Sequence, residues 1–314
     1  MRVFRARRLT AAVGAMLLTC AAMATVTGCG SLLDKAIGNE SGGVTIGSQG
    51  FTESRILAEM YRQLLDANGI DAHVKTVSNR ELLEPALAKG EVGLAPDYAA
   101  TLAEFLNLKE NGPDAPPVAS PDIAVTMNAL TGLAVKQNLQ LGTPAQAVDQ
   151  NAFAVTREFA AKNNLKTLSD LGASGLPVRI AAGEECNVRP FCRPGLEQTY
   201  GIKATGVDPL GVGTAASKQA VQDGRDQMAL VTTTDATLDR YGLVLLADDK
   251  KLQNADNIVP VANRGDAAKV LPVIDRLSPV LTTEDLAEMN KKVDQQRRRP
   301  ATVVHDYLKE KGLI

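Results

Sequence analysis

Residues 43–69 read GVTIGSQGFTESRILAEMYRQLLDANG, and they join a short β-branched run to a helical pattern through a polar, glycine-flanked turn. Thr52 is the expected N-cap of the helix, and Gly69 its expected end. Glu53 suits the positive end of the helix dipole. Apolar residues recur at helical spacing: Ile56, Leu57, Met60, Leu64 and Leu65. The turn suits a small ligand, but it also suits a simple reversal of the chain.

Two more strand–helix pairs follow the first one. Strands are expected over 72–78 and 91–96, with a helix from Asn79 to Gly90 and another opening at Asp97. Three such units in a row predict a parallel sheet covered by helices. Ligands bind beyond the carboxyl ends of the strands in such sheets. Gln49 and Tyr98 fall at such ends, although Gln49 can be only a turn residue and Tyr98 only a core residue.

The second half of the chain contains another α/β series. A Pro-rich surface loop over 110–122 precedes a long middle segment, and strand and helix patterns then alternate as far as Asp235. Two further apolar strands and three amphipathic helices complete the chain. The 314 residues are enough for two lobes of ordinary domain size. Two series joined by crossing segments predict two lobes with a cleft between them.

The charge distribution gives nucleic-acid binding little support. Formal net charge is −2, and after the N-terminal thirty residues no basic run stands out apart from Arg297-Arg298-Arg299 near the end of the chain. Nucleic-acid binding requires a clustered positive surface. The arginine run is better interpreted as a solvated helix end.

The first thirty residues have the pattern of an export signal. A basic start, MRVFRARR, is followed by an apolar stretch that is short for a membrane span, and then by VTGC at 26–29. Small residues directly before a Cys resemble the bacterial lipobox. The resemblance implies cleavage before Cys29, followed by acylation of its thiol and new amine. The alternative is a plain signal peptide with an incidental Cys.

Two cysteines remain in the exported part of the chain. Cys186 and Cys192 are separated by five residues in EECNVRPFCRPG, with no His nearby, which disfavours zinc. A local disulfide is the better interpretation for an oxidising compartment, with two free thiols as the alternative.

Catalytic motifs are weak or missing from the sequence. GVGTAA at 211–216 matches only part of a dinucleotide loop, and there is no Walker A, G-x-S-x-G or HExxH pattern. The chain has two histidines, His73 and His305, so a Ser-His-Asp triad would need one of them. We therefore expect no enzyme, metal or cofactor. A secreted hydrolase that uses His305 is the remaining alternative.

An ordered set of motifs resembles the glycine betaine, choline and carnitine type substrate-binding proteins of ABC importers. The resemblance covers nearly all of residues 44–314, and its motifs are, in order, IGSQGFTESRILAEMYRQLL, ALAKGEVGLAPDYAATL, LKTLSDL, RPGLEQTYG, TTTDATLDRYGLVLLADDK, NIVPVAN and the C-terminal RRRPATVVHDYLKEKGL. It implies an α/β, two-lobed type II periplasmic-binding-protein fold, with a ligand cleft between lobes that close on the ligand.

The resemblance also implies a division of the chain. The segments are a lipoprotein signal peptide (1–28), a flexible tether (29–43), the first part of lobe I (44–149), lobe II (150–235), and a return to lobe I with the C-terminal helices (236–314).

The family's pocket is a box of tyrosines around a quaternary ammonium, because aromatic faces attract cations. The residues of this chain that match pocket positions by motif are Gln49, Tyr98, Thr101, Asp149 and Arg189. The places of three further tyrosines are taken by Asn151, Thr232 and Asp256. Each of these residues also has an ordinary structural interpretation; Arg189, for example, can be a surface residue beside the cysteine loop.

The loss of three aromatic contacts has a cost for a betaine ligand. At about 0.5–2 kcal/mol for each cation–π contact, the loss is roughly 2–6 kcal/mol. That is about 10- to 10,000-fold in affinity. A small polar or zwitterionic solute, with its carboxylate on Arg189, fits these residues better.

The partners that the resemblance implies are an ABC permease, its ATPase and, through Cys29, the extracytoplasmic face of the cell membrane. Receptors of this kind act as monomers, and a monomer is expected here. The main rival is a sensory or scavenging lipoprotein of the same fold that has no transport partner.

Mass spectrometry of the mature protein tests the anchor. We expect an N-terminal peptide that begins at Cys29 and carries acyl chains on both its thiol and its amine. An unmodified N-terminus would contradict this expectation.

Overall fold

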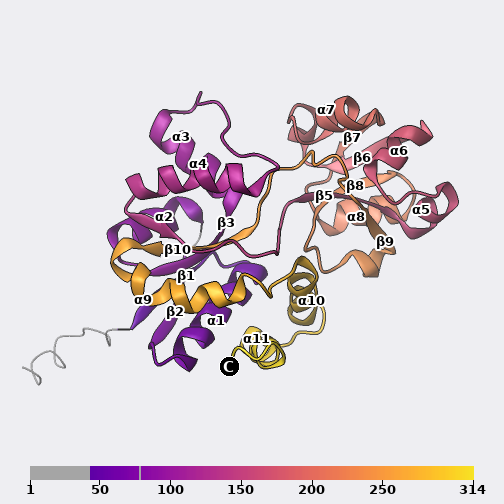
Figure 1. Cartoon of the computed structure of the whole chain (residues 1–314). Coiled ribbons are helices and arrows are strands. Elements are labelled where there is room, and N and C mark those ends of the chain that lie inside the picture. The colour runs from indigo at the N-terminus through magenta and orange to yellow at the C-terminus, as the bar shows by residue number, and fades with distance from the viewer. Residues whose placement is uncertain (1–42, 78) are drawn as a thin grey trace, which may run out of the picture. The chain divides into compact units, whose positions relative to one another are not determined.

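Residues 43–77 and 79–314 are described in the computed structural model of the chain, apart from the side chain of Glu185. The predicted signal peptide, the lipidated Cys29 and the tether up to residue 42 lie outside the described residues. Figure 1 shows the secondary-structure elements, which gather around two separate sheets.

The first sheet has five strands in the order β2-β1-β3-β10-β4. Strand β1 is parallel to both of its neighbours, whereas β10 is antiparallel to β3 and β4. The parallel sheet predicted for the first three strands is therefore confirmed, and the complete sheet is mixed. Its strands are β1 (Val44–Ser48), β2 (Ala72–Thr76), β3 (Leu94–Tyr98), β4 (Leu139–Leu141) and β10 (Ile258–Asn263).

Seven α-helices accompany this sheet in the described chain. They are α1 (Thr52–Ala67), α2 (Arg80–Lys89), α3 (Ala99–Asn111), α4 (Ile123–Lys136), α9 (Arg264–Ile274), α10 (Thr283–Asp294) and α11 (Pro300–Glu310).

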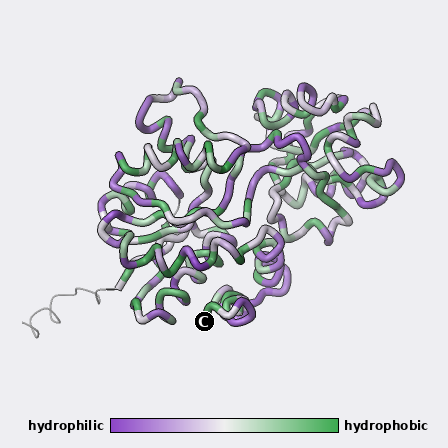
Figure 2. The backbone as a smooth tube through the Cα atoms, in the orientation of Figure 1, coloured by the Kyte–Doolittle hydropathy of each residue, from purple (hydrophilic) through white to green (hydrophobic). Residues whose placement is uncertain are grey.

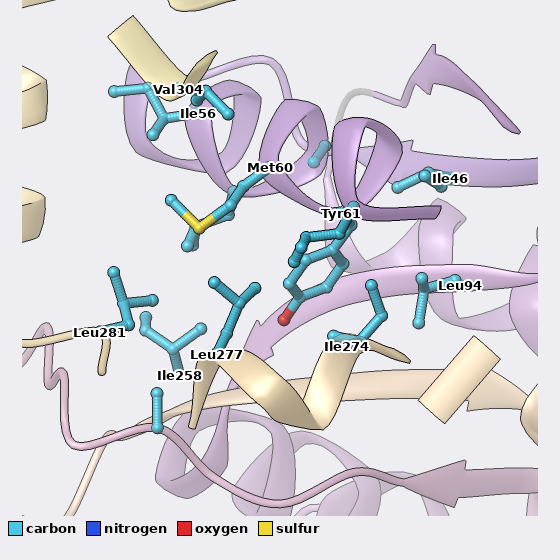
Figure 3. Packing of buried hydrophobic residues seen from close by; sticks show 14 of the residues in the cluster. Ile46, Ile56, Met60, Tyr61, Leu94, Ile258, Ile274, Leu277, Leu281 and Val304 are labelled. Atoms are coloured by element: carbon cyan, nitrogen blue, oxygen red, sulfur yellow. The ribbon is translucent and has the colours of Figure 1, made fainter. Parts of the chain in front are cut away.

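Helix α1 is the centre of the first core. All the apolar residues that the sequence placed on its inner face are buried. Figure 3 shows Met60 and Tyr61 pointing from α1 toward Leu277 and Ile274. Ile274 is the last residue of α9, and Leu277 lies in the turn that follows it. Helices α9, α10 and α11 pack on the same helix. In Figure 2 hydrophobic and hydrophilic residues alternate along the C-terminal helices, as expected for helices that bury one face.

The second sheet repeats the pattern of the first, in the order β7-β6-β8-β5-β9. Strand β6 is parallel to both neighbours, and β5 is antiparallel to β8 and β9. The strands are β5 (Asn151–Thr156), β6 (Pro177–Ala182), β7 (Lys203–Pro209), β8 (Met228–Thr232) and β9 (Leu243–Leu246). The accompanying helices are α5 (Arg157–Asn163), α6 (Leu168–Ser174), α7 (Arg193–Gly195), which continues as a π-helical turn (Leu196–Tyr200), and α8 (Ala215–Gln222).

Two segments, 142–150 and 247–257, connect the sheets, and they pair with each other. The Ala145 N–H donates to the Ile258 carbonyl (2.8 Å), and the Ile258 N–H donates to the Ala147 carbonyl (3.0 Å). Further along, the Asp149 N–H donates to the Asp256 carbonyl (3.2 Å). We call this antiparallel pair the crossing ribbon. Strands β5 and β10, the antiparallel members of the two sheets, each begin where the ribbon ends.

Three of the five predicted helix boundaries in the first lobe are confirmed. Gly69 follows the C-cap residue of α1 and has the positive φ (74°) that favours glycine there. The Asn79 side chain accepts from the Leu82 N–H, and Gly90 ends α2 in the left-handed conformation that glycine adopts easily. Thr52 is not an N-cap, because Phe51 holds that position and the Thr52 hydroxyl donates to Asp294 (2.6 Å). Asp97 does not open a helix: it lies in β3, buried, paired with Arg80 at 2.6 Å.

The predicted end of lobe II at residue 235 is too early. Strand β9 pairs in register with β5, so the chain stays with the second sheet until Leu246. The apolar run that forms β9 predicts a strand but not the sheet to which the strand belongs, because hydropathy does not determine which strand it pairs with.

No helix among residues 43–77 and 79–314 is long and apolar enough to cross a membrane.

Leu64→Ala and Leu82→Ala remove the same atoms from two helices. Leu64 in α1 is fully buried, and Leu82 in α2 is 57% exposed. We expect the first substitution to lower the free energy of unfolding by about 2–5 kcal/mol, because it removes buried surface and leaves a cavity. The second should change it by less than about 0.5 kcal/mol. Urea unfolding followed by circular dichroism measures both, and equal losses would contradict the assignment of α1 to the core.

Candidate functional site

A cavity of about 630 Å³ lies where residues of the two sheets meet at the crossing ribbon. Seven of the eight ligand positions predicted from the sequence line it, and Gln49 is the exception. The lining residues are Phe51, Arg80, Tyr98, Ala100, Thr101, Glu104, Asp149, Gln150, Asn151, Arg189, Phe191, Thr232, Gln253, Asn254 and Asp256.

Tyr98 is the last residue of β3 and directly precedes α3, so it lies at the carboxyl end of a central strand. It is only 9% exposed, and part of its surface faces the cavity. Its hydroxyl donates to Glu53 Oε1 (2.9 Å), while Asn290 Nδ2 donates to Glu53 Oε2 (2.7 Å). Asn290 lies on α10, so a side chain from the C-terminal part of the chain fixes the carboxylate that orients Tyr98.

Glu53 and Asp149 are two carboxyls whose pKa values are raised, mainly because they are withdrawn from water. Burial, and then the charge of Asp149, raise the pKa of Glu53 to about 7. Burial is also the largest cause of the raised pKa of Asp149. The sequence pattern predicted only a dipole role for Glu53. A carboxyl that is buried beside another carboxyl is visible only in three dimensions.

Asp256 is held by the start of helix α3. The backbone N–H of Thr101 donates to Asp256 Oδ1 (3.0 Å), and the Thr101 hydroxyl donates to Asp256 Oδ2. Asp256 comes from the second crossing segment, so it caps α3 from a remote part of the chain. Burial raises its pKa to about 6, although the Thr101 hydrogen bonds oppose the shift. Asp256 and Thr101 line the cavity together, already bonded to each other.

The second sheet contributes a polar wall. Asn151 on β5 and Thr232 on β8 lie directly opposite each other in the antiparallel register. Asp149 precedes Asn151 by two residues, and the backbones of Gln150 and Thr233 are joined by a hydrogen bond of 2.9 Å. Residues that the family motif places in separate pocket positions are therefore neighbours here.

The disulfide expected between Cys186 and Cys192 is present, with Cα atoms 5.1 Å apart. It closes a short loop that carries Arg189 and Phe191 to the cavity. The loop is further held by Gln253, whose Nε2 donates to the Phe191 carbonyl (2.8 Å). The cross-link thus restricts the two side chains that this loop contributes.

The aromatic lining is larger than the sequence predicted. Phe51 stacks near Tyr98, with ring centroids 6.4 Å apart and planes inclined by 24°. Phe191 is a third aromatic side chain at the cavity. The lining therefore has two aromatic side chains besides Tyr98 that the motif match did not identify. Phe51 lies in the quoted opening turn and Phe191 beside Cys192, so proximity to predicted site segments could have indicated both.

Gln49 is not among the residues that line the cavity, and its predicted contact with a ligand stays a prediction. Its side-chain Nε2 is buried and has no hydrogen-bond partner in the described chain. Its backbone N–H donates to Ser54 Oγ (2.8 Å), which holds it in the turn between β1 and α1. Phe51, two residues later, reaches the cavity instead. The alternative interpretation, a turn residue, describes the observed contact.

Arg80 and Glu104 line the cavity but have partners elsewhere. The guanidinium of Arg80 holds Asp97 through both carboxylate oxygens. Glu104 Oε1 accepts from the backbone N–H groups of Val118 (2.8 Å) and Ala119 (2.6 Å). Neither residue was predicted, because nothing in the local sequence distinguishes them from surface charges.

Two further residues lie outside the lining of this cavity. Asp235 caps its own turn by accepting from the Thr237 N–H (2.8 Å). His305 lines a shallow groove between α1 and α11. No Ser is among the described residues that line this groove, so a Ser-His pair is not seen there.

Comparison with known proteins identifies similar chains. Residues 42–310 match the family model described as the substrate binding domain of the ABC-type glycine betaine transport system. The glycine betaine-binding protein YehZ of Escherichia coli K12 is 27% identical over 289 residues, which cover 86% of this chain and 90% of that protein. The glycine-betaine-binding protein of Pseudomonas aeruginosa is 25% identical over 282 residues, 86% of this chain and 88% of the relative.

Among solved structures, apo YehZ from Escherichia coli superposes with a TM-score of 0.74 at 23% identity. The match covers 87% of this chain and all of that one. It confirms the predicted α/β fold with two lobes.

Glu53→Gln tests the buried carboxyl pair. The pKa of Glu53 in the folded chain, about 7, lies above its ordinary value of 4.5, so the folded state binds the proton more tightly. Stability of the wild type should therefore fall as pH rises from about 4.5 to 7. At about 1.4 kcal/mol for each pKa unit, the fall is up to roughly 3 kcal/mol, which the Gln variant escapes.

Urea unfolding at pH 5 and pH 7.5 measures this effect. The variant should gain on the wild type at the higher pH. Glu81→Gln is the matched control, since Glu81 is also the second residue of its helix but is exposed. An equal difference between Glu53→Gln and wild type at both pH values would contradict the assignment.

Proposed function

The chain belongs to the family of substrate-binding domains of ABC-type glycine betaine transport systems, and we propose that it is the extracytoplasmic solute receptor of an importer of this osmoprotectant type. The observation that supports this role best is the single cavity lined by seven of the eight residues carried over from the family motifs. Those residues come from both sheets, as a receptor that encloses its ligand requires.

The proposed ligand is a small polar or zwitterionic solute. The cavity offers three aromatic side chains and a group of carboxyls to a positive group. Arg189 offers a guanidinium that can hold a carboxylate through two hydrogen bonds. A solute that carries both charges uses both ends of the site. No catalytic step is proposed.

Binding is proposed to act by lobe closure. The crossing ribbon is a short two-stranded connection, which suits a hinge, because a few residues there can absorb a rotation between two sheets. A ligand that contacts Tyr98 on one side and Arg189 on the other gains more contacts in the closed state. It therefore shifts the population toward that state, which a permease can recognise.

The proposed setting is the outer side of the cell membrane, with the protein anchored as a monomer through acylated Cys29. The anchor would keep the receptor near the permease, which receives the solute while an ATPase drives transport.

Titration calorimetry against glycine betaine, choline, carnitine, ectoine and amino acids tests the function. We expect saturable binding of at least one of these solutes at one site per chain. No heat of binding with any of them would contradict the proposal.

Arg189→Ala tests the site. We expect at least a tenfold weaker affinity for a ligand with a carboxylate, because its charge partner is lost. Arg193→Ala is the control, since Arg193 lies just beyond the disulfide and pairs with Glu197 (2.9 Å) outside the cavity lining. An affinity that does not change in Arg189→Ala would remove Arg189 from the site.

A further inference from the structure

We infer that the positive group of the solute carries N–H donors, as a primary or secondary ammonium or a guanidinium does, and that Asp149 selects it over a fully N-methylated group. The inference rests on the proposed function and specifies the ligand of that same cavity.

The carboxyls of the cavity differ in what they already bind. Glu104 holds two backbone N–H groups, and Asp256 holds the N–H and hydroxyl of Thr101. In Asp149, by contrast, Oδ1 is buried and has no hydrogen-bond partner among the described residues. Of the acidic residues that line the cavity in the described chain, Asp149 is therefore the one with a buried oxygen that lacks a hydrogen-bond partner.

A buried carboxylate oxygen without a donor is unfavourable, since it has lost its water. Thr232 and Thr234 interact with the Asp149 carboxyl and oppose the rise of its pKa, but Oδ1 itself has no hydrogen-bond partner in the described chain.

Two cations that share a cavity lining with Asp149 pair with other carboxylates: Lys218 with Asp235 (2.7 Å), and Arg80 with Asp97. The third, Arg189, is the group proposed to hold the carboxylate of the solute. The nearby acidic groups, Asp235 and Glu53, have the same sign of charge as Asp149 and cannot compensate it. A ligand that supplies both a positive charge and a hydrogen-bond donor resolves both deficits.

A trimethylammonium group supplies only the charge. Its surface consists of C–H groups, so it would cover Asp149 Oδ1 without donating a conventional hydrogen bond. An ammonium or guanidinium N–H donates directly, and a charge-assisted bond of this kind is stronger than a neutral one.

The rest of the wall favours the same group. Asn151 and Thr232 lie beside Asp149 on paired strands and offer side-chain oxygens as further acceptors. Phe51 and Tyr98, from the first lobe, can cover the apolar part of the ligand or a ring face of its cation. The cavity therefore suits a positive group that donates hydrogen bonds toward Asp149 and lies against the aromatic rings of Phe51 and Tyr98 on its other side.

The experiment uses a series of solutes that differ only in N-methylation: glycine, sarcosine, dimethylglycine and glycine betaine, with ethanolamine and choline as a second pair. Affinities are measured by calorimetry with the wild type and with Asp149→Asn. We expect affinity to fall as methyl groups are added, by at least tenfold between the first and last members. In Asp149→Asn this preference should shrink, mainly through weaker binding of the N–H ligands.

Two further variants make the result decisive. Asp114→Asn, an exposed loop substitution, should keep the wild-type preference. Asn151→Tyr adds an aromatic ring to the polar wall and should move the preference toward the methylated ligands. Circular dichroism shows whether Asp149→Asn folds. If it does not fold, Asn151→Tyr still tests whether the polar side of the cavity sets the preference.

Equal or tighter binding of the methylated ligands by the wild type would overturn the inference and leave the receptor function intact. A preference that survives in Asp149→Asn would overturn the role of Asp149. Failure of every solute in both this series and the wider panel would overturn the proposed function itself.

Discussion

The pairing of the two crossing segments is the constraint on which the site depends. Three backbone hydrogen bonds hold residues 145–149 against 256–258, and each sheet's antiparallel strand starts from this ribbon. Asp149 and Asp256 therefore face one cavity although they are more than a hundred residues apart. The same ribbon brings Asp256 to the start of α3, where it binds Thr101 and so fixes the end of the first sheet beside Tyr98.

Buried carboxyls give the cavity its chemical character. Glu53 orients Tyr98, Asp97 holds Arg80, and Asp256 caps a helix, so each of these three has a structural partner. Asp149 lies among them with one oxygen unused. Carboxyls concentrated in a cavity raise each other's pKa and favour the entry of a cation. In the proposed complex, the acceptors around Asp149 determine how the positive group of the solute is bound.

Much of the fold was predictable because its signals are local. Hydrophobic periodicity indicated α1, and Asn79 with Gly90 marked both ends of α2. The error at Thr52 arose because Phe51 begins the helix without a side-chain cap, and β9 was misassigned because strand pairing is a long-range choice. In the site, motif spacing identified seven lining residues. Gln49 lies in the turn that Ser54 closes and is absent from the lining. Phe51 in the same turn could have been indicated by its proximity to predicted site residues, whereas only tertiary contacts bring Arg80 and Glu104 to the cavity.

A crystal structure of the protein saturated with the tightest-binding solute tests the central claim most directly. The account predicts density for one solute between Tyr98 of the first lobe and the Asp149–Asn151 wall of the second, with a nitrogen of the solute within hydrogen-bond distance of Asp149. Solute bound in the groove between α1 and α11, or outside the cavity altogether, would contradict it.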